Sequence, residues 1–211
     1  MPTRAERRTQ SRAGSDGATP DRRAPPKAPR RARPRGPNDP GRRDRIAAAA
    51  LEVALTQGVG AVSHRNVAAA AGVPLGSTTY HFRGLDDLLS AAMEQAAAAY
   101  AELLVTWSGA IADGADVVDA LCDLVEHSLG PGRERLVAEY ELYFAGLRRP
   151  ALRPVSSAWS GLLALVLAQH VDEMTARELA IVVDGVFVNA LVTGGEPRRP
   201  DLYELLRKIS G

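Results

Sequence analysis

The chain of 211 residues has a single cysteine, few aromatic residues (5 %) and no long apolar run. Cys122 alone cannot form an intramolecular disulfide, a zinc ribbon or a CxxC redox site. The longest nearly apolar stretch, residues 161–168, is far shorter than the roughly 20 residues that a membrane span needs. No apolar signal segment opens the chain, so we expect a cytoplasmic protein without a membrane partner.

Residues 1–40 contain no Leu, Ile, Val, Phe, Tyr or Trp, but hold eight of the fourteen prolines. A segment with so little to bury cannot offset an ordering entropy of about 1–2 kcal/mol per residue, which predicts a disordered Arg/Pro-rich tail. The net charge is +7 in residues 1–40, +3 in 41–84 and −9 in 85–211. A basic N-terminal part suggests a polyanionic partner. Two interpretations stay open, an arm that adds sequence-independent affinity for phosphates and an inert tail from a wrongly chosen start.

Helical patterning begins at Gly41, because apolar side chains then recur at the spacing of one helix face in Ile46, Ala49, Ala50, Val53 and Ala54. Two short helices are predicted over 64–71 and 75–81, joined by a turn at residues 72–74. Longer helices are predicted over 85–108, 117–129, 133–147, 151–170, 175–193 and 202–209. No segment shows sustained period-two alternation, so the sequence predicts an all-α fold.

Two short helices joined by a glycine-containing turn and preceded by a third form a helix-turn-helix, whose second short helix enters a major groove about 12 Å wide. Residues 62–82 read VSHRNVAAAAGVPLGSTTYHF. This run resembles the DNA-binding signature of the TetR family, and the resemblance covers about residues 42–89. It implies a three-helix DNA-binding domain over 41–84 and a helical effector-binding and dimerisation domain over 85–211.

The resemblance further implies a homodimeric, cytoplasmic, nucleoid-associated repressor that binds a palindromic double-stranded operator. A small molecule bound in the second domain then alters its operator affinity, and no cofactor, metal or catalytic residue is expected. Carried over position by position, and supplemented by the hydrogen-bonding capacity of the hydroxyl side chains, the DNA-binding residues are Ser63, Arg65, Leu75, Gly76, Ser77, Thr78, Thr79, Tyr80, His81 and Arg83.

The sequence departs from the family pattern at two positions. Thr79 stands where the family often has Tyr, and Leu85 stands where it commonly has Lys, so Arg83 is assigned the phosphate contact. Arg65 can donate two hydrogen bonds to guanine, a contact that gives about 1–3 kcal/mol of discrimination. Several of these residues also have a purely structural interpretation: Ser63 as a helix cap, Arg65 as a solvated side chain, and Tyr80 and Phe82 as core residues.

The homodimer is predicted to form through residues 151–170 and 175–193, with an ordinary intramolecular core as the alternative. The apolar residues available for that interface are Leu162, Leu163, Leu165, Val166, Ile181, Val182, Val186, Val188 and Leu191. An effector of unknown identity is expected among the helices beyond residue 85, although each aromatic residue there also suits a plain core. The candidates are Tyr100, Trp107, His127, Tyr140, Tyr143, Phe144, Trp159, Asp184 and Asn189.

Three other functions compete with this interpretation. An enzyme is disfavoured, because the four histidines lack metal-ligand spacing and Cys122 lies five residues from His127, a poor offset for a nucleophile–base pair. An architectural DNA-binding protein that uses the basic tail is the main alternative, and its binding would be sequence-independent. An activator in place of a repressor is equally compatible with the sequence, because the sign of regulation depends on operator position.

Overall fold

The computed structural model describes residues 39–211, and in this range the chain forms helices and no strand, which confirms the predicted all-α fold. The predicted tail over residues 1–40 lies outside the described residues except for its last two. The helical elements are α1 (Arg42–Gln57), η1 (Val59–Ala61), α2 (His64–Ala70), α3 (Leu75–His81), α4 (Leu85–Ala112), α5 (Val117–Leu129), α6 (Arg133–Arg148), η2 (Pro150–Leu152), α7 (Arg153–Ser160), α8 (Leu162–Leu167), α9 (Glu173–Thr193) and α10 (Arg199–Ser210).

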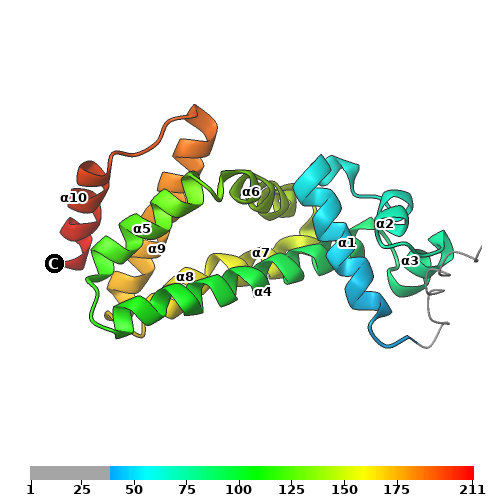
Figure 1. Ribbon diagram of the computed structural model, residues 1–211, viewed down its shortest axis with the longest axis horizontal. Helices are drawn as coiled ribbons and strands as arrows, with labels where there is room; N and C mark the ends of the chain where they lie inside the picture. Colours follow the sequence, from blue (N-terminus) through cyan, green and yellow to red (C-terminus); the bar gives the residue numbers. More distant parts are fainter. Residues whose placement is uncertain (1–38) are drawn as a thin grey trace, which may run out of the picture. The chain divides into compact units, whose positions relative to one another are not determined.

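The first three helices and the start of α4 share one hydrophobic core, in which α1 contacts α2 and α4 and α2 contacts α3 (Figure 1). Ile46 and Val53 from α1, Val67 from α2, Phe82 after α3 and Leu88 from α4 are all almost completely buried there. Burying each of these side chains contributes about 1.5–3 kcal/mol to folding. The amphipathic pattern in the sequence therefore corresponds to the face of α1 that packs inward.

The turn between α2 and α3 depends on Gly72, whose φ of 62° lies in the left-handed region that side chains other than glycine seldom adopt. The turn is closed by the Val73 amide, which donates to the Ala68 carbonyl at 3.0 Å. At the other end of α2, the Ser63 hydroxyl accepts from the Asn66 amide at 3.2 Å, as an N-cap should. These local bonds set how α3 leaves α2.

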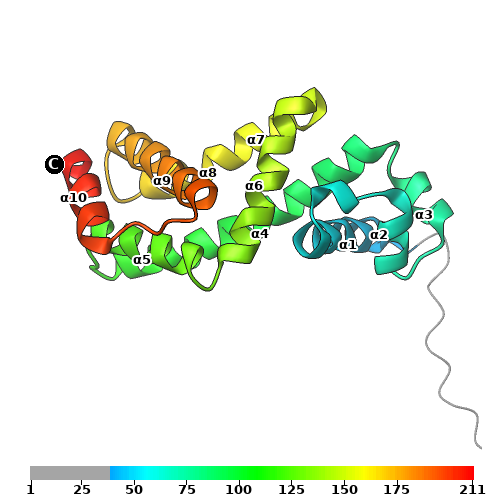
Figure 2. The same ribbon diagram turned by 90° about the horizontal axis from the view of Figure 1, so that it is seen from above.

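A second core lies among the later helices, and five of them each contribute a fully buried or nearly buried leucine: Leu104 (α4), Leu121 (α5), Leu167 (α8), Leu179 (α9) and Leu206 (α10). Figure 2 shows α8, α9 and α10 in succession, with α9 in contact with both of the others. The helix α4 contributes to both cores, and the domain boundary that the sequence predicts at 84/85 falls at its first residue. No helix among residues 39–211 is long and apolar enough to cross a membrane.

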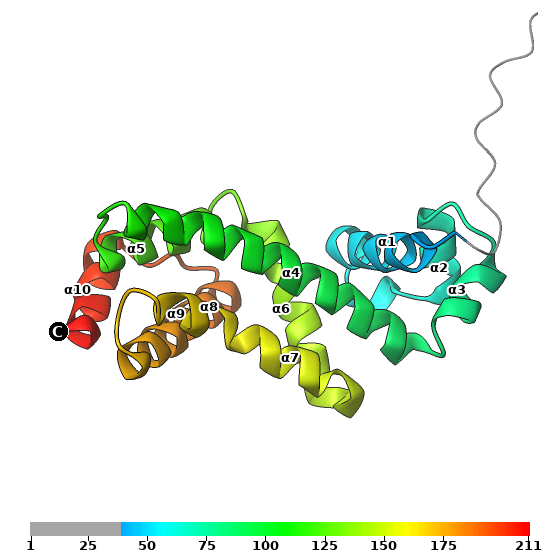
Figure 3. The same cartoon turned by 90° about the horizontal axis from the view of Figure 1, so that it is seen from below.

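Ion pairs fasten α10 to α5, which Figure 3 shows side by side. Arg199 contacts three carboxylates of α5, those of Asp119, Asp123 and Glu126, at 2.6–3.2 Å. Arg207 adds a contact of 2.8 Å to Asp116, which also caps the N-terminus of α5. The exposed carboxylates of α5 are thus matched by cations of the last helix.

The single helix predicted over 151–170 is wrong, because the chain forms η2, α7 and α8 there. The break between α7 and α8 comes at Gly161, whose amide bonds to Ala158 three residues back in place of the α-helical partner. Glycine has low helix propensity, so a tightened turn costs little at this position. Elsewhere α7 approaches α6 closely, since a Cβ at Gly146 would lie 2.6 Å from the Ser156 hydroxyl.

Candidate DNA-binding helix and ligand pocket

One face of α3 is exposed to solvent. Leu75 is 46 % exposed and Tyr80 is 80 % exposed, and Gly76 and Thr79 are exposed beside them. These four positions are spaced so that they lie on one side of a helix. The sequence predicted all four as DNA-binding, and the structure places them together, free of the core.

Thr78 is a correction to the predicted set, because it is completely buried. Its hydroxyl donates to the Leu75 carbonyl at 2.8 Å and lies 3.4 Å from the His64 carbonyl of α2. A side chain without accessible surface cannot contact a base edge. Thr78 instead packs α3 against α2, a role that hydrogen-bonding capacity alone does not reveal in a run of three hydroxyl residues.

The other predicted DNA-binding residues surround this face. Arg65 on α2 and Arg83 after α3 are exposed, whereas Ser63 and His81 are half-buried. The ring of His81 lies edge-on to that of Tyr80, with centroids 5.1 Å apart. Ser77, also half-buried, has a partner that the sequence did not predict as part of the site, since its hydroxyl accepts from Arg42 at 3.4 Å.

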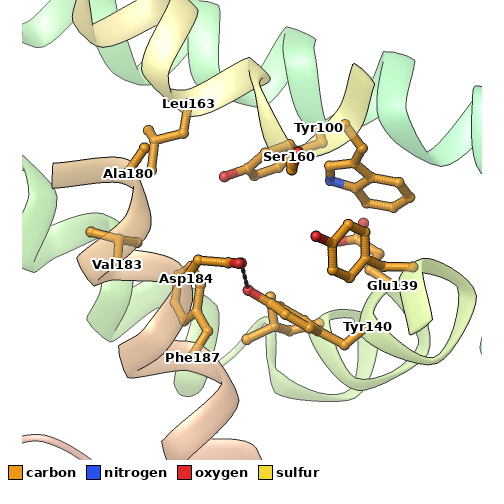
Figure 4. Close-up of a pocket in the computed structure, with 12 residues that line it drawn as sticks. Tyr100, Glu139, Tyr140, Ser160, Leu163, Ala180, Val183, Asp184 and Phe187 are labelled. Carbon is orange, nitrogen blue, oxygen red and sulfur yellow. Dashed lines mark hydrogen bonds between the residues drawn. The ribbon is translucent and has the colours of Figure 1, made fainter. Parts of the chain in front are cut away.

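A pocket of about 560 Å³, counting its open mouth, lies between α4, α6, α7, α8 and α9. Figure 4 shows Ala180, Val183, Asp184 and Phe187 of α9 on one side of the pocket, with Leu163 next to Ala180, and Tyr100 and Ser160 across from Asp184. Within residues 39–211, no basic side chain lines it. Its lining residues are Tyr100, Leu136, Glu139, Tyr140, Tyr143, Trp159, Ser160, Leu163, Ala180, Val183, Asp184 and Phe187.

Two carboxylates give this aromatic pocket its chemical character. Asp184 accepts a short hydrogen bond from the Tyr140 hydroxyl (Figure 4). Glu139 is buried beside the pocket, where Arg135, which is itself half exposed, pairs with it at 2.7 Å. Burial raises the pKa of Glu139 above its usual range, and the Arg135 contact opposes part of that rise.

Two half-buried tyrosines of the pocket have a raised pKa. Burial raises the pKa of Tyr100, with the charges of Glu139 and Asp184 adding to the effect. Burial and the hydrogen bond to Asp184 raise the pKa of Tyr140. Neutral phenol rings next to carboxylates favour a cation, because aromatic faces attract positive charge.

The pocket brings together five of the predicted effector residues, namely Tyr100, Tyr140, Tyr143, Trp159 and Asp184. The other four predicted candidates lie elsewhere. The Trp107 indole donates to the Ala120 carbonyl at 2.8 Å and so anchors α4 to α5. His127 is exposed on α5, Phe144 is an exposed neighbour of the pocket tyrosines, and Asn189 lines a separate hollow between α9 and α10.

Sequence reasoning missed Glu139 and Phe187 as pocket residues. Glu139 shares one face of α6 with Leu136, Tyr140 and Tyr143, at offsets of three, four and seven residues from Leu136. That spacing was the signal that could have found it. Phe187 has no comparable signal, because it lies in an apolar run that reads as ordinary core.

A row of mostly apolar, exposed residues runs along α9, and α8 exposes one large apolar side chain. Met174 is 61 % exposed, Ile181 65 % and Val192 80 %, and together with Glu178, Gly185 and Val188 they repeat at alternating spacings of four and three. Leu165 of α8 is 68 % exposed. Of the residues expected at the dimer interface, Leu163 and Val166 are instead buried within the chain's own core. Such a row is unusual on a monomer surface.

Two family models match parts of this chain. Residues 46–92 match the family model of bacterial regulatory proteins of the tetR family, and residues 112–211 match the model of the tetracyclin repressor-like C-terminal domain. Among proteins with curated functions, none matches the chain.

Solved structures match over most of their length. The multidrug binding protein EbrR complexed with ethidium is 43 % identical, with a TM-score of 0.74, over 81 % of this chain and 99 % of that one. The TetR-family member SCO1917 from Streptomyces coelicolor A3 is 43 % identical, with a TM-score of 0.69, over 82 % and 99 %. The putative regulator SCO7518 from Streptomyces coelicolor A3(2) is 32 % identical, with a TM-score of 0.72, over 81 % and 99 %. With its helix-turn-helix, its helical second region and these relatives, the chain belongs to the TetR family of transcriptional regulators.

Proposed function

We propose that the chain is a homodimeric repressor that binds a palindromic operator through α3 and releases it when a flat cationic molecule fills the α4–α9 pocket. The observation that carries this proposal is the exposed face of α3 formed by Leu75, Gly76, Thr79 and Tyr80. The Thr79 hydroxyl and the Tyr80 phenol can bond to base edges and phosphates in a major groove, and Gly76 has no side chain to hold the DNA away. We place its action on chromosomal DNA in the cytoplasm.

The ligand class follows from the lining of the pocket. Five aromatic side chains and two carboxylates, with no basic residue among the described ones that line it, favour an aromatic cation over an anion or a neutral sugar. The relative EbrR is known in complexes with ethidium and proflavin, both flat aromatic cations. Ethidium is therefore the first probe to use.

The dimer is proposed to form through the apolar row of α9 together with Leu165 of α8. One module has few base contacts, whereas two modules related by a two-fold axis read two half-sites of a palindrome. Side chains that are more than 60 % exposed in one chain, such as Ile181, would be buried by the partner copy. The Glu178 and Gly185 positions within the row would set how closely the two copies of α9 approach.

The proposal is tested by selecting bound duplexes from a random pool with the full chain, followed by adding ethidium to the complexes of the wild-type chain and of Asp184→Asn, because ethidium also intercalates into DNA. We expect an enriched palindrome, and release of the duplex from the wild type at a lower ethidium concentration than from Asp184→Asn. Selection of no sequence would refute operator recognition and leave the architectural alternative, in which deleting residues 1–40 abolishes binding. An enriched palindrome that ethidium does not release, or releases equally from the wild type and from Asp184→Asn, would refute the ligand part alone.

A further inference from the structure

Arg42, in the first turn of α1, is an arginine whose charge has no counterion within the described chain. The residue is only 7 % exposed. Its one side-chain hydrogen bond goes from Nη1 to the Ser77 hydroxyl of α3 at 3.4 Å, and Nε is buried with no partner among residues 39–211. The neighbouring Asp39 instead pairs with Arg45 at 2.6 Å.

A buried guanidinium in this condition is unusual in a folded protein. It carries five N–H donors, and buried charges are generally paired or fully hydrogen-bonded because removing them from water is costly. Arg199 of this chain shows the ordinary arrangement, with three carboxylates around one exposed guanidinium. Arg42 therefore has N–H groups that can donate to an acceptor outside residues 39–211.

The immediate surroundings of Arg42 are mixed in charge, with Asp44 in the first turn of α1 and Arg43 beside Arg42. The N-cap of α1 is Gly41, which has no side chain to cap the first turn, and the Arg42 amide donates to the Asp39 carbonyl at 3.1 Å. A helix N-terminus attracts negative charge through the free amides of its first turn and through the helix dipole. Arg43, next along the chain, adds a second cation, and its guanidinium stacks 5.0 Å above the ring of Phe82.

The partner of Arg42 connects this place to the exposed face of α3. Ser77 directly follows Leu75 and Gly76 on that helix. A duplex lying against these two residues would pass next to Ser77 and its hydrogen-bond partner Arg42 at the start of α1. An anion there would accept from the Nη donors of Arg42, which unlike Nε are not buried without a partner, while the bond to Ser77 holds α3 at a fixed register to the same phosphate.

We propose that Arg42 and the first turn of α1 bind a phosphate of the DNA backbone, and that Arg42 positions α3 on the duplex through Ser77. This inference rests on the proposed function, because it takes α3 as the DNA-reading helix. Phosphate contacts position a protein but carry no sequence information. Arg42 accordingly contributes affinity and salt dependence but no base preference.

The test compares the full chain with its Arg42→Met variant, which keeps an apolar stem and removes the charge. Duplex binding is measured by fluorescence anisotropy across a salt series, on the selected operator and on a random duplex. Each phosphate that the protein no longer neutralises makes the slope of log K against log salt shallower by about 0.9. We expect that change for each protomer, with about tenfold weaker binding for each phosphate, on both duplexes and with an unchanged site preference.

Thermal unfolding of the same variant separates binding from a structural role. Removing an unpaired buried charge should leave the melting temperature unchanged or raise it. Lys208→Met on α10, where Lys208 pairs with Glu204 at 2.8 Å, is the charge-matched control and should alter neither slope nor stability. A wild-type slope in Arg42→Met, or a lower melting temperature without a slope change, overturns the inference.

Measurements on the random duplex separate failure of the Arg42 inference from failure of the proposed operator recognition. If the wild-type chain selects no operator, sequence recognition fails, yet the Arg42 contribution to the salt slope is still measurable. Inorganic phosphate at matched ionic strength gives a further check. Competition that weakens duplex binding by the wild type but not by Arg42→Met supports a phosphate at this place, and equal weakening of both contradicts it.

Discussion

The Tyr140 hydroxyl on α6 donates a hydrogen bond to the Asp184 carboxylate on α9, and this bond closes one side of the pocket. Asp184 lies directly before Gly185 in the row that we propose as the dimer interface. A ligand that competes for the carboxylate therefore acts on the helix that carries the proposed dimer interface. In the proposed dimer, ligand binding and the spacing of the two α3 helices would be linked through α9.

The charge of Asp184 should govern cation binding. Asp184→Asn keeps an oxygen that accepts from Tyr140 but removes the negative charge. We expect ethidium affinity to fall about tenfold, roughly 1.4 kcal/mol, with little change in melting temperature. Fluorescence titration measures the affinity, and Asp201→Asn on α10 controls for the change in net charge. Equal losses in both variants would contradict a direct role for Asp184.

Glu139 should make cation binding dependent on pH. Because burial raises its pKa, the carboxylate loses its charge at a higher pH than an ordinary glutamate does as the solution is acidified. Ethidium affinity should fall as pH drops through that raised pKa. Glu139→Gln should have about tenfold lower affinity at neutral pH and a flat profile. A pH dependence that survives in the variant would assign the effect to another group.

The raised pKa of Glu139 also makes the stability of the fold depend on pH, in the opposite direction to ethidium affinity. A carboxyl whose folded pKa is raised stabilises the fold at pH values below its ordinary pKa, and that contribution is lost as pH rises through the folded value. Thermal melts of the ligand-free chain should therefore favour Glu139→Gln at neutral pH, and the difference should shrink in acid. A lower melting temperature of the variant at neutral pH would show instead that the Arg135 pair outweighs burial.

Thr78 and Thr79 should behave differently although they are adjacent. Thr78→Val removes a buried hydroxyl that donates to the Leu75 carbonyl, and it should cost about 0.5–1.5 kcal/mol of unfolding free energy without altering the operator preference. Thr79→Val changes an exposed side chain on the α3 face, so it should alter DNA binding and leave stability intact. Chemical denaturation and site selection on both variants measure this contrast. An unaltered operator preference in Thr79→Val would remove Thr79 from the reading face.

Ile181 should control the oligomeric state. Ile181→Asp places a charge in the exposed apolar row of α9 and should convert the dimer to a monomer at micromolar concentration, because an unpaired charge is costly at a buried interface. Val105→Asp on α4 is the matched control, since Val105 is 66 % exposed and Ile181 is 65 % exposed. Analytical ultracentrifugation distinguishes the two states. A dimer that persists in Ile181→Asp would contradict the proposed interface.

The sequence predicted helix boundaries well where capping and turn residues next to the helix determine them. The boundaries of α3 and of α5 were predicted to the residue, because each has a clear start and stop, such as the Asp116 cap of α5. The break at Gly161 was missed, because the apolar spacing of residues 151–170 continues through it. One glycine inside an amphipathic run does not show whether the helix tolerates it or turns there.

The amino-acid sequence by itself determined the all-α class, the helix-turn-helix and its turn at Gly72, since periodicity, caps and glycine conformations depend on neighbours a few residues apart. Tertiary structure alone decided that Thr78 faces α2, that Glu139 lies beside the pocket, and that Arg42 meets Ser77 from 35 residues away. Those outcomes depend on which helix faces meet in space. The roles of these residues therefore follow from burial and charge pairing across the fold and cannot be read from the identity of a single side chain.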